Sequence, residues 1–228
     1  MNFNKLTVAG LYAALLVSTA NATVVSGTAV ADDWFGNTDA TYTAFTVSGD
    51  PTDVFLRTFG ADGGPTRSAL EFSLGAIAAG STINSATFTI KSRGTSVGGG
   101  TFSFWGYAGD GVIAAADALE TASLLTSMPT QDLSASYVVD VTALIQSLID
   151  SSIQYAGILI TVSPEGSFFG SDFLSSEGDQ SGAGFLASDR PDLTVDFSSR
   201  QSVPEPGSMA LLLLALAVFA AARPRAFG

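Results

Sequence analysis

Between residues 23 and 199 the chain is a succession of short runs in which apolar or β-branched residues alternate with polar ones. Gly, Asp, Ser and Pro separate the runs. Side chains on a strand point to opposite faces of a sheet in turn, so such runs fit half-buried strands. Many short strands predict a sandwich or barrel. We expect an all-β, jelly-roll-like β-sandwich, with strands at 41–47, 54–59, 68–72, 85–91, 101–105, 137–140, 157–162, 168–175 and 193–197.

The alternation is cleanest in residues 86–91. There we expect Ala86, Phe88 and Ile90 to face the core and the polar residues between them to face water. The glycine run 98–100 precedes a strand and is not followed by Lys-Ser or Lys-Thr, so it predicts a turn or bulge and not a phosphate-binding loop.

One short helix interrupts the strands. Apolar residues recur at helical spacing after Asp140 and Val141, and Thr142 is expected to cap the first turn. These apolar residues are Leu144, Ile145, Leu148 and Ile149. The polar stretch 150–152 should end the helix, which is expected to lie across one end of the sandwich.

The N-terminal residues 1–22 have the pattern of a secretory signal peptide. Lys5 supplies the positive charge, residues 6–17 form the apolar segment, and Ala20 and Ala22 form an A-x-A cleavage site. We therefore expect passage through the secretory translocon, with the mature protein beginning near Thr23.

The C-terminal residues 200–228 combine three elements in a fixed order. The motif 203–207, Val-Pro-Glu-Pro-Gly, precedes an apolar membrane helix expected at 208–222 and a basic end at 223–225. A helix needs ~20 residues to cross a bilayer comfortably, so this one crosses only under strain. The basic end should stay at the cytoplasmic face, which leaves the residues before Pro204 outside.

This tail resembles the PEP-CTERM sorting signal of Gram-negative bacteria. Val203, Pro204, Glu205 and Pro206 stand at the motif. The resemblance implies that exosortase, a membrane transpeptidase, reads the tail, and that the protein is held in the inner membrane before it is processed for the cell surface or extracellular matrix. It also implies a host that makes extracellular polysaccharide. The alternative is an ordinary C-terminal membrane anchor.

The body resembles the DNRLRE-type domain in several segments. Residues 67–74, 79–83 and 85–88 are similar to the opening strands of that domain, and residues 140–142, 155–160, 175–177 and 190–195 are similar to its later part. Ser73 stands where the family usually has aspartate. The resemblance implies a jelly-roll-like sandwich, and some members are carbohydrate-binding modules. It implies no binding residue here.

Length and charge limit the classes of function. Removing both terminal segments leaves about 180 residues, which suits one domain, expected at 23–199. Residues 23–203 contain six basic and twenty acidic residues, a net charge of −14. Such a surface repels nucleic acid. The chain has no Cys and no His, which excludes thiol nucleophiles, disulfides, the usual zinc sites and imidazole bases.

Two acidic groups are candidates for chemistry. Asp110 and Asp117 flank a glycine as in the second half of a calcium loop, but Gly106 and Ala108 supply no side-chain oxygen where such a loop needs ligands. A hairpin turn is the alternative, so calcium is a possible cofactor and no other is expected.

Glu177 and Asp179, with Asp172 nearby, form the densest acidic cluster. Paired carboxylates can hydrolyse glycosidic bonds at suitable separations. A structural role for Glu177, bonded to backbone or paired with Arg190, is the favoured interpretation.

Aromatic side chains are the candidates for a glycan platform, because the apolar C–H faces of sugars stack on them. Trp105 and Tyr107 are the first candidates, and Trp34, Phe168 and Phe169 are others. Trp105 should point to the opposite face from Phe102 and Phe104, where it is either exposed or packed beneath a loop.

These observations favour an exported, non-enzymatic protein of the cell surface or of the biofilm and exopolysaccharide matrix. Its expected partners are the translocon, exosortase, the inner membrane through the C-terminal helix, and extracellular polysaccharide. A carbohydrate-binding module is the alternative. A glycoside hydrolase or polysaccharide lyase is disfavoured because the body lacks His and has few basic residues.

Overall fold

The structure is a computed structural model, which describes residues 22–39, 43–49, 55–60, 64–93, 97–120, 123–131, 135–166, 168–176 and 186–199. The predicted sorting tail, and the predicted signal peptide apart from Ala22, lie outside these residues. Asn21–Arg200 form one compact unit. Among the described residues, no helix is long and apolar enough to cross a membrane.

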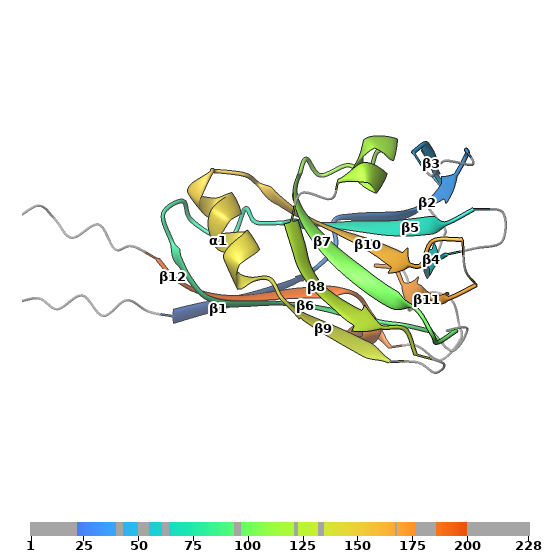
Figure 1. Ribbon diagram of the computed structural model, residues 1–228. Coiled ribbons are helices and arrows are strands. Elements are labelled where there is room, and N and C mark those ends of the chain that lie inside the picture. The colour runs from blue at the N-terminus through green and yellow to red at the C-terminus, as the bar shows by residue number, and fades with distance from the viewer. Residues whose placement is uncertain are drawn as a thin grey trace, which may run out of the picture. The chain divides into compact units, whose positions relative to one another are not determined.

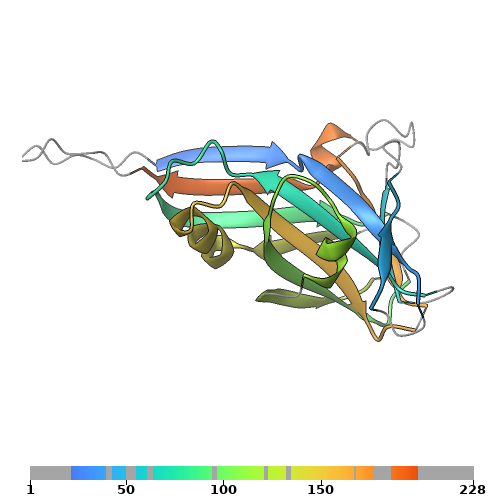
Figure 2. The ribbon, with the colours of Figure 1, turned by 90° about the horizontal axis from the view of Figure 1, so that it is seen from above.

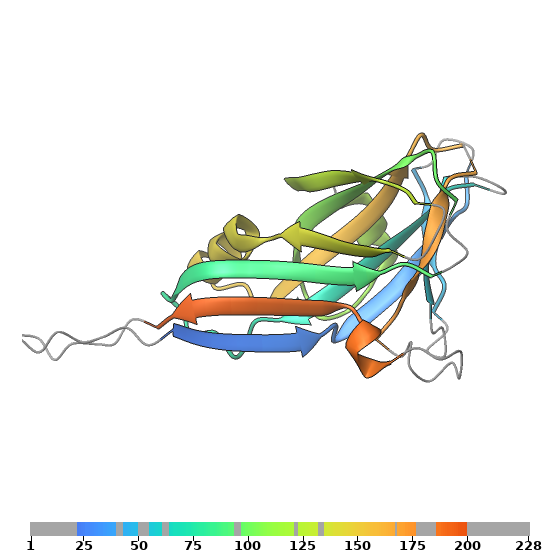
Figure 3. The same cartoon turned by 90° about the horizontal axis from the view of Figure 1, so that it is seen from below.

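Three antiparallel sheets build the body (Figures 1 and 3). Sheet A has the order β1-β12-β6-β9, sheet B has the order β3-β2-β5-β10-β7-β8, and sheet C is the pair β11-β4. The strands are β1 Ala22–Thr28, β2 Ala31–Asn37, β3 Phe45–Val47, β4 Phe55–Phe59, β5 Thr66–Ser73, β6 Thr82–Lys91, β7 Thr101–Gly109, β8 Ser123–Pro129, β9 Ser136–Asp140, β10 Tyr155–Ser163, β11 Gly170–Leu174 and β12 Asp192–Ser198. The helices are α1 Thr142–Asp150 and the short 3₁₀ helices η1 Ala115–Leu119 and η3 Ala187–Asp189.

The predicted all-β sandwich with one short α-helix is confirmed. Three strands were not predicted: β1, β2 and β8. β1 has few apolar residues and an internal glycine, β2 contains Asp, Gly and Asn, and β8 ends in proline. These are residues that local propensity assigns to turns. Pairing with β12, β5 and β7 makes them strands.

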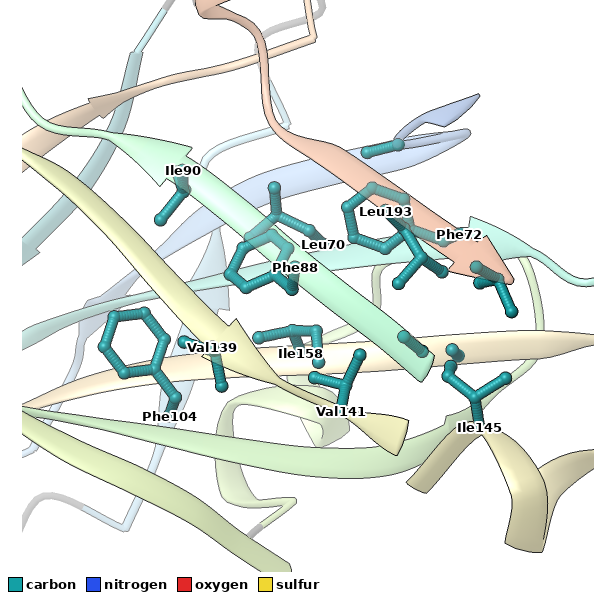
Figure 4. Close-up of a cluster of buried hydrophobic side chains, with 14 of the residues drawn as sticks. Leu70, Phe72, Phe88, Ile90, Phe104, Val139, Val141, Ile145, Ile158 and Leu193 are labelled. Carbon is teal, nitrogen blue, oxygen red and sulfur yellow. The ribbon is translucent and has the colours of Figure 1, made fainter. Parts of the chain in front are cut away.

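The main core lies between sheets A and B (Figure 4). Phe88 of β6 is fully buried, and its ring makes edge contacts with Phe72 of β5, at 5.7 Å between centroids, and with Phe104 of β7, at 6.4 Å. Ile158 of β10 and Val139 of β9 complete the layer. The alternation of β6 is confirmed, because Ala86, Phe88 and Ile90 are buried and the residues between them are half-buried.

α1 packs on this core through Ile145, Leu148 and Ile149. The expectation that Thr142 caps it is wrong. Thr142 is the first helical residue, and Val141, which occupies the cap position, makes no side-chain cap bond. The Thr142 N–H donates to Asp140 Oδ1 at 2.9 Å. The Thr142 hydroxyl instead accepts the Ala86 N–H of β6 at 2.9 Å, so it ties the helix to sheet A.

Sheet B is apolar on its outer face as well. Phe35, Ala69 and Leu159 form a second buried cluster there with Tyr107, closed by Phe45 of β3 and Ala118 of η1. β5 and β10 are therefore buried on both faces, which explains the nearly continuous apolar sequence of residues 156–160.

The two ends of the body lie side by side. β1 pairs with β12 along its whole length, with Ala22 opposite Ser198 (Figure 1). The residue at the predicted signal cleavage site and the last strand residue before the sorting tail are thus neighbours on the edge of sheet A.

Two glycine sites make room for aromatic rings. The ring of Phe169 lies against Gly99 and Gly100, so a Cβ at Gly99, whose φ is +112°, would come within 2.7 Å of that ring. Gly99 and Gly100 form a bend immediately before β7, where the sequence predicted a turn or bulge. Gly157 of β10 lies beneath the Tyr107 ring, where a Cβ would stand 2.2 Å from Cζ.

Gly157→Ala should therefore destabilise the protein, because neither the β10 backbone nor the enclosed Tyr107 ring can move away. We expect a loss of roughly 1–3 kcal/mol or more in the free energy of unfolding, measured by urea denaturation. The matched control is Gly27→Ala in β1, where nothing lies within 4 Å of the added Cβ; its stability should change by less than about 0.5 kcal/mol. Equal stability of the two variants would contradict the packing of Tyr107 on Gly157.

Candidate functional site

A buried polar cluster occupies the outer face of sheet B. Glu71 of β5, Gly157 of β10 and Tyr107 of β7 are in register across three neighbouring strands. Glu71 is 1% exposed and Tyr107 is 3% exposed. Glu71 Oε2 accepts the backbone N–H groups of Asp110, at 3.1 Å, and Gly111. The carboxylate therefore fixes the turn that leads from β7 towards η1.

The environment of this cluster disfavours negative charge. Burial raises the pKa of Glu71, and the N–H of Gly111 opposes that shift only in part. Burial is also the main cause that raises the pKa of Tyr107, and the negative charge of Glu71 is the second cause. The Glu71 and Tyr107 side chains interact with each other in this enclosure. Within the described part of the chain, Glu71 Oε1 and the Tyr107 hydroxyl have no further hydrogen-bond partner. A carboxyl group with a raised pKa is suited to proton transfer, but this one is enclosed and holds a loop.

Arg67 fixes the cover over the same face. Its Nη1 donates to the Ala118 carbonyl of η1 at 2.6 Å, and its Nη2 donates to Glu165 Oε1 at 2.7 Å. The guanidinium also lies 4.4 Å from the ring centroid of Phe45 in β3. One largely buried cation thus joins three segments that close over sheet B.

The expected glycan platform of Trp105 and Tyr107 lies under this cover. Trp105 does point away from Phe102 and Phe104, as predicted, but it is half-buried against the second cluster. Its Nε1 donates to Thr161 Oγ1 at 3.0 Å. Tyr107 is enclosed by Gly157 and Glu71. The expectation of an open platform is therefore corrected, since these side chains pack beneath a loop.

The expected calcium ligands bond to their own turns. Asp110 Oδ1 accepts the Val112 N–H at 2.9 Å, and Asp117 Oδ2 accepts the Ala114 N–H at 2.6 Å. In the described ranges, no three acidic side chains are arranged to hold a metal ion. The geometry fits the alternative of a turn, with Gly111 at a φ of +93°. Glu177 and Asp179 lie outside the described residues.

A different surface is open to solvent at sheet C. We call it the sheet C face and define it by Trp34, Arg57, Phe59, Phe168 and Asp172. Phe168 is 59% exposed, the highest exposure of an aromatic side chain in the described ranges. Its ring centroid lies 6.3 Å from that of Phe59 on β4.

The charged part of the sheet C face adjoins these rings. Arg57 and Phe59 stand two residues apart on β4 and flank the buried Thr58, so their side chains share the outer face. Arg57 lies opposite Asp172 of β11, and its Nε donates to Asp172 Oδ1 at 3.2 Å. The guanidinium also lies 5.6 Å from the ring centroid of Trp34 on β2. The Arg57 side chain is 53% exposed, whereas the Asp172 side chain is 10% exposed, so the arginine is the member of the pair that faces solvent.

Sequence reasoning identified Trp34, Phe168 and Asp172 separately but missed Arg57 and the surface that joins them. The Arg57–Asp172 pair is separated by 115 residues. The available signal was the pair of aromatic residues at 168–169 followed by a strand that contains Asp172. Nothing local indicated that β4 would pair with β11.

Comparison with known proteins identifies the tail. Residues 202–226 match the PEP-CTERM protein-sorting motif. The predicted resemblance of the tail is confirmed, and the motif implies an exported protein. No curated protein matches the chain. The matching family model covers the tail, so the DNRLRE-type resemblance of the body stays a prediction.

The body is similar to a solved structure, the native family 35 carbohydrate binding module from Clostridium thermocellum. The sequence identity is 10% and the TM-score is 0.28. The match covers 75% of this chain and 97% of the module.

The buried Glu71 predicts a specific pH dependence of stability. Its pKa in the folded protein is raised above 4.5, so the folded chain binds more protons than the unfolded chain above that pH. Folding stability therefore falls as the pH rises from 4.5 through the folded-state pKa. Glu71→Gln removes this contribution, so its melting temperature should fall less than that of the wild type between pH 4.5 and 7.

Asp140→Asn is the matched control for this measurement. Hydrogen bonds from Thr142 lower the pKa of Asp140 below 3.8, so its contribution to stability is present above that value and is lost as the pH falls. The control should alter only the acidic limb of the curve. Parallel curves for Glu71→Gln and the wild type between pH 4.5 and 7 would show that Glu71 is not perturbed.

Proposed function

We propose that the protein is an exported, non-enzymatic component of the cell surface or extracellular matrix of a Gram-negative bacterium, sorted by an exosortase. The observation that carries the proposal is the sorting motif at residues 202–226. The motif begins four residues after β12, the last strand of the body. The folded domain is thus the part that such sorting delivers.

The route follows from the two terminal segments. The signal peptide directs the chain to the translocon, and the apolar C-terminal helix holds it in the inner membrane with the body outside. Exosortase then processes the chain near Pro204, Glu205 and Pro206. The body is released into the medium or attached to the cell surface, within the extracellular polysaccharide of the biofilm.

The contents of the body support a role without catalysis. The chain has no His and no Cys. The one buried carboxyl group with a raised pKa in the described residues, Glu71, is enclosed beneath η1 and bonded to the turn at 110–111. Turnover of a polysaccharide by the purified protein would contradict this part of the proposal.

A carbohydrate-binding module is the second candidate function. The observation that favours it is the sheet C face, where an exposed aromatic ring stands beside an arginine and an aspartate. Apolar rings beside hydrogen-bonding groups are the usual composition of sites for small polar ligands. The two candidates are compatible, because a matrix protein can be held in place by the polysaccharide around it.

Replacing Pro204, Glu205 and Pro206 together by alanine tests the sorting. We expect the wild type in the native host to end near residue 204 and to appear outside the inner membrane. The variant should remain full-length in the membrane, because the recognition motif is absent while the apolar helix is intact. Cell fractionation followed by mass spectrometry of both termini makes the measurement.

Gln201→Ala, outside the motif, is the control and should be processed like the wild type. If the wild type also stays full-length in the membrane, the tail is an ordinary anchor and the proposed function loses its support. The N-terminal peptide tests the signal prediction in the same experiment, with Thr23 expected as the first residue.

A further inference from the structure

We propose that the sheet C face binds a neutral polysaccharide chain, with Phe168 and Phe59 stacking on sugar rings and Arg57, held in place by Asp172, donating to hydroxyl groups. This inference rests on the proposed function, which places the body among extracellular polysaccharides. It assigns the binding to the sheet C face and not to Trp105 and Tyr107, the first candidates from the sequence.

The aromatic part of the face has the geometry of a stacking platform. A large apolar ring in water is unfavourable, and Phe168 exposes 59% of its surface. The ring is tilted by 43° against Phe59, which is anchored in β4 by pairing with Gly170. Phe168 is therefore supported from one side and open on the other. The apolar face of a pyranose fits such a ring.

The polar part of the face is held ready for hydroxyl groups. A guanidinium carries five N–H donors, and Asp172 accepts from one of them, the Nε–H. The Trp34 ring on one side and the Asp172 carboxylate on the other restrict the arginine side chain before any ligand arrives. Such preorganisation reduces the entropy lost on binding. The exposed N–H groups of Arg57 are donors for hydroxyl oxygens, while the largely buried Asp172 positions the arginine.

Charge selects the class of polysaccharide. A ligand carboxylate near Arg57 would also meet Asp172, whose own carboxylate already neutralises the guanidinium. The exported part of the chain has a net charge of −14, which repels polyanions at low ionic strength. A neutral chain avoids both repulsions, so uronic-acid polymers are disfavoured and neutral polysaccharides are favoured.

Two hollows among the described residues lack this combination. One, of about 350 Å³, lies between β8 and α1 and is lined by Leu124, Leu125 and Leu144, with Asp140 at its edge and no aromatic ring. Another, of about 260 Å³, lies beneath β1 and is lined by aliphatic and small residues around Phe72. Neither brings an exposed aromatic ring next to a paired arginine and aspartate.

The test uses the processed protein from its host and the extracellular polysaccharide of the same host, separated by anion exchange into neutral and acidic fractions. Affinity electrophoresis through gels containing each fraction gives the dissociation constants. We expect retardation by the neutral fraction. Phe168→Ser should weaken it about five- to tenfold, because it removes one stacking contact. Arg57→Lys, which keeps the charge and loses the planar fork of donors, should weaken it several-fold.

Val138→Ser is the matched control. Val138 is 55% exposed on β9 in sheet A, so the substitution removes a similar exposed apolar surface away from the sheet C face. It should bind like the wild type, and all variants should keep the melting temperature of the wild type within a few degrees.

Three results would overturn the inference. They are no retardation of the wild type by the neutral fraction, equal retardation of the wild type and Phe168→Ser, and tighter binding to the acidic fraction. Correct trimming near residue 204 without retardation would leave the proposed function standing and remove the binding site. Absence of trimming would remove the proposed function whatever the gels show.

Discussion

The fold depends on sheet B being apolar on both faces. β10, at its centre, buries Ile158 and Ile160 against sheet A and Leu159 against the second cluster. A sheet of this kind must be covered twice, and the second cover is the segment that contains η1, which meets Phe45 of the edge strand β3, instead of another sheet (Figure 2). Arg67 and Glu71 hold that cover by bonding to η1 and to the turn before it. The Arg67 and Glu71 side chains are therefore largely buried under the segment that they bind.

This constraint explains how far the sequence could predict the structure. Alternation identified the inner strands. It also placed Phe88 and Ile90 in the core, because the side-chain period of a strand determines which residues face inward whichever strands lie opposite. β1 and β2 escaped prediction because pairing, and not local composition, makes them strands. The sheet face to which Trp105 points was predicted. The burial of that face was not predicted, because it depends on contacts from β3 and η1, which are distant in the sequence.

The candidate site was predictable only in pieces. Trp34, Arg57 and Asp172 come from three strands and meet because β4 pairs with β11 and passes β2. The spacing of these three residues in the sequence does not indicate that they are in contact. The sorting tail is the opposite case, because a contiguous motif carries it and one sequence is sufficient to find it. The sorting motif and the proposed binding site are therefore encoded differently, the first in adjacent residues and the second in tertiary structure.

The proposed site places neutral polysaccharide on the sheet C face of the exported body and not on β7. The most direct measurement is a ¹H–¹⁵N NMR titration of the processed protein with oligosaccharides cut from the neutral polysaccharide of its host. We expect the Arg57 Nε–H signal and the backbone amides of β4 and β11 to shift with the added sugar, and those around Trp105 to stay unchanged. Shifts confined to β7 and η1, or no shifts at saturating sugar, would contradict it.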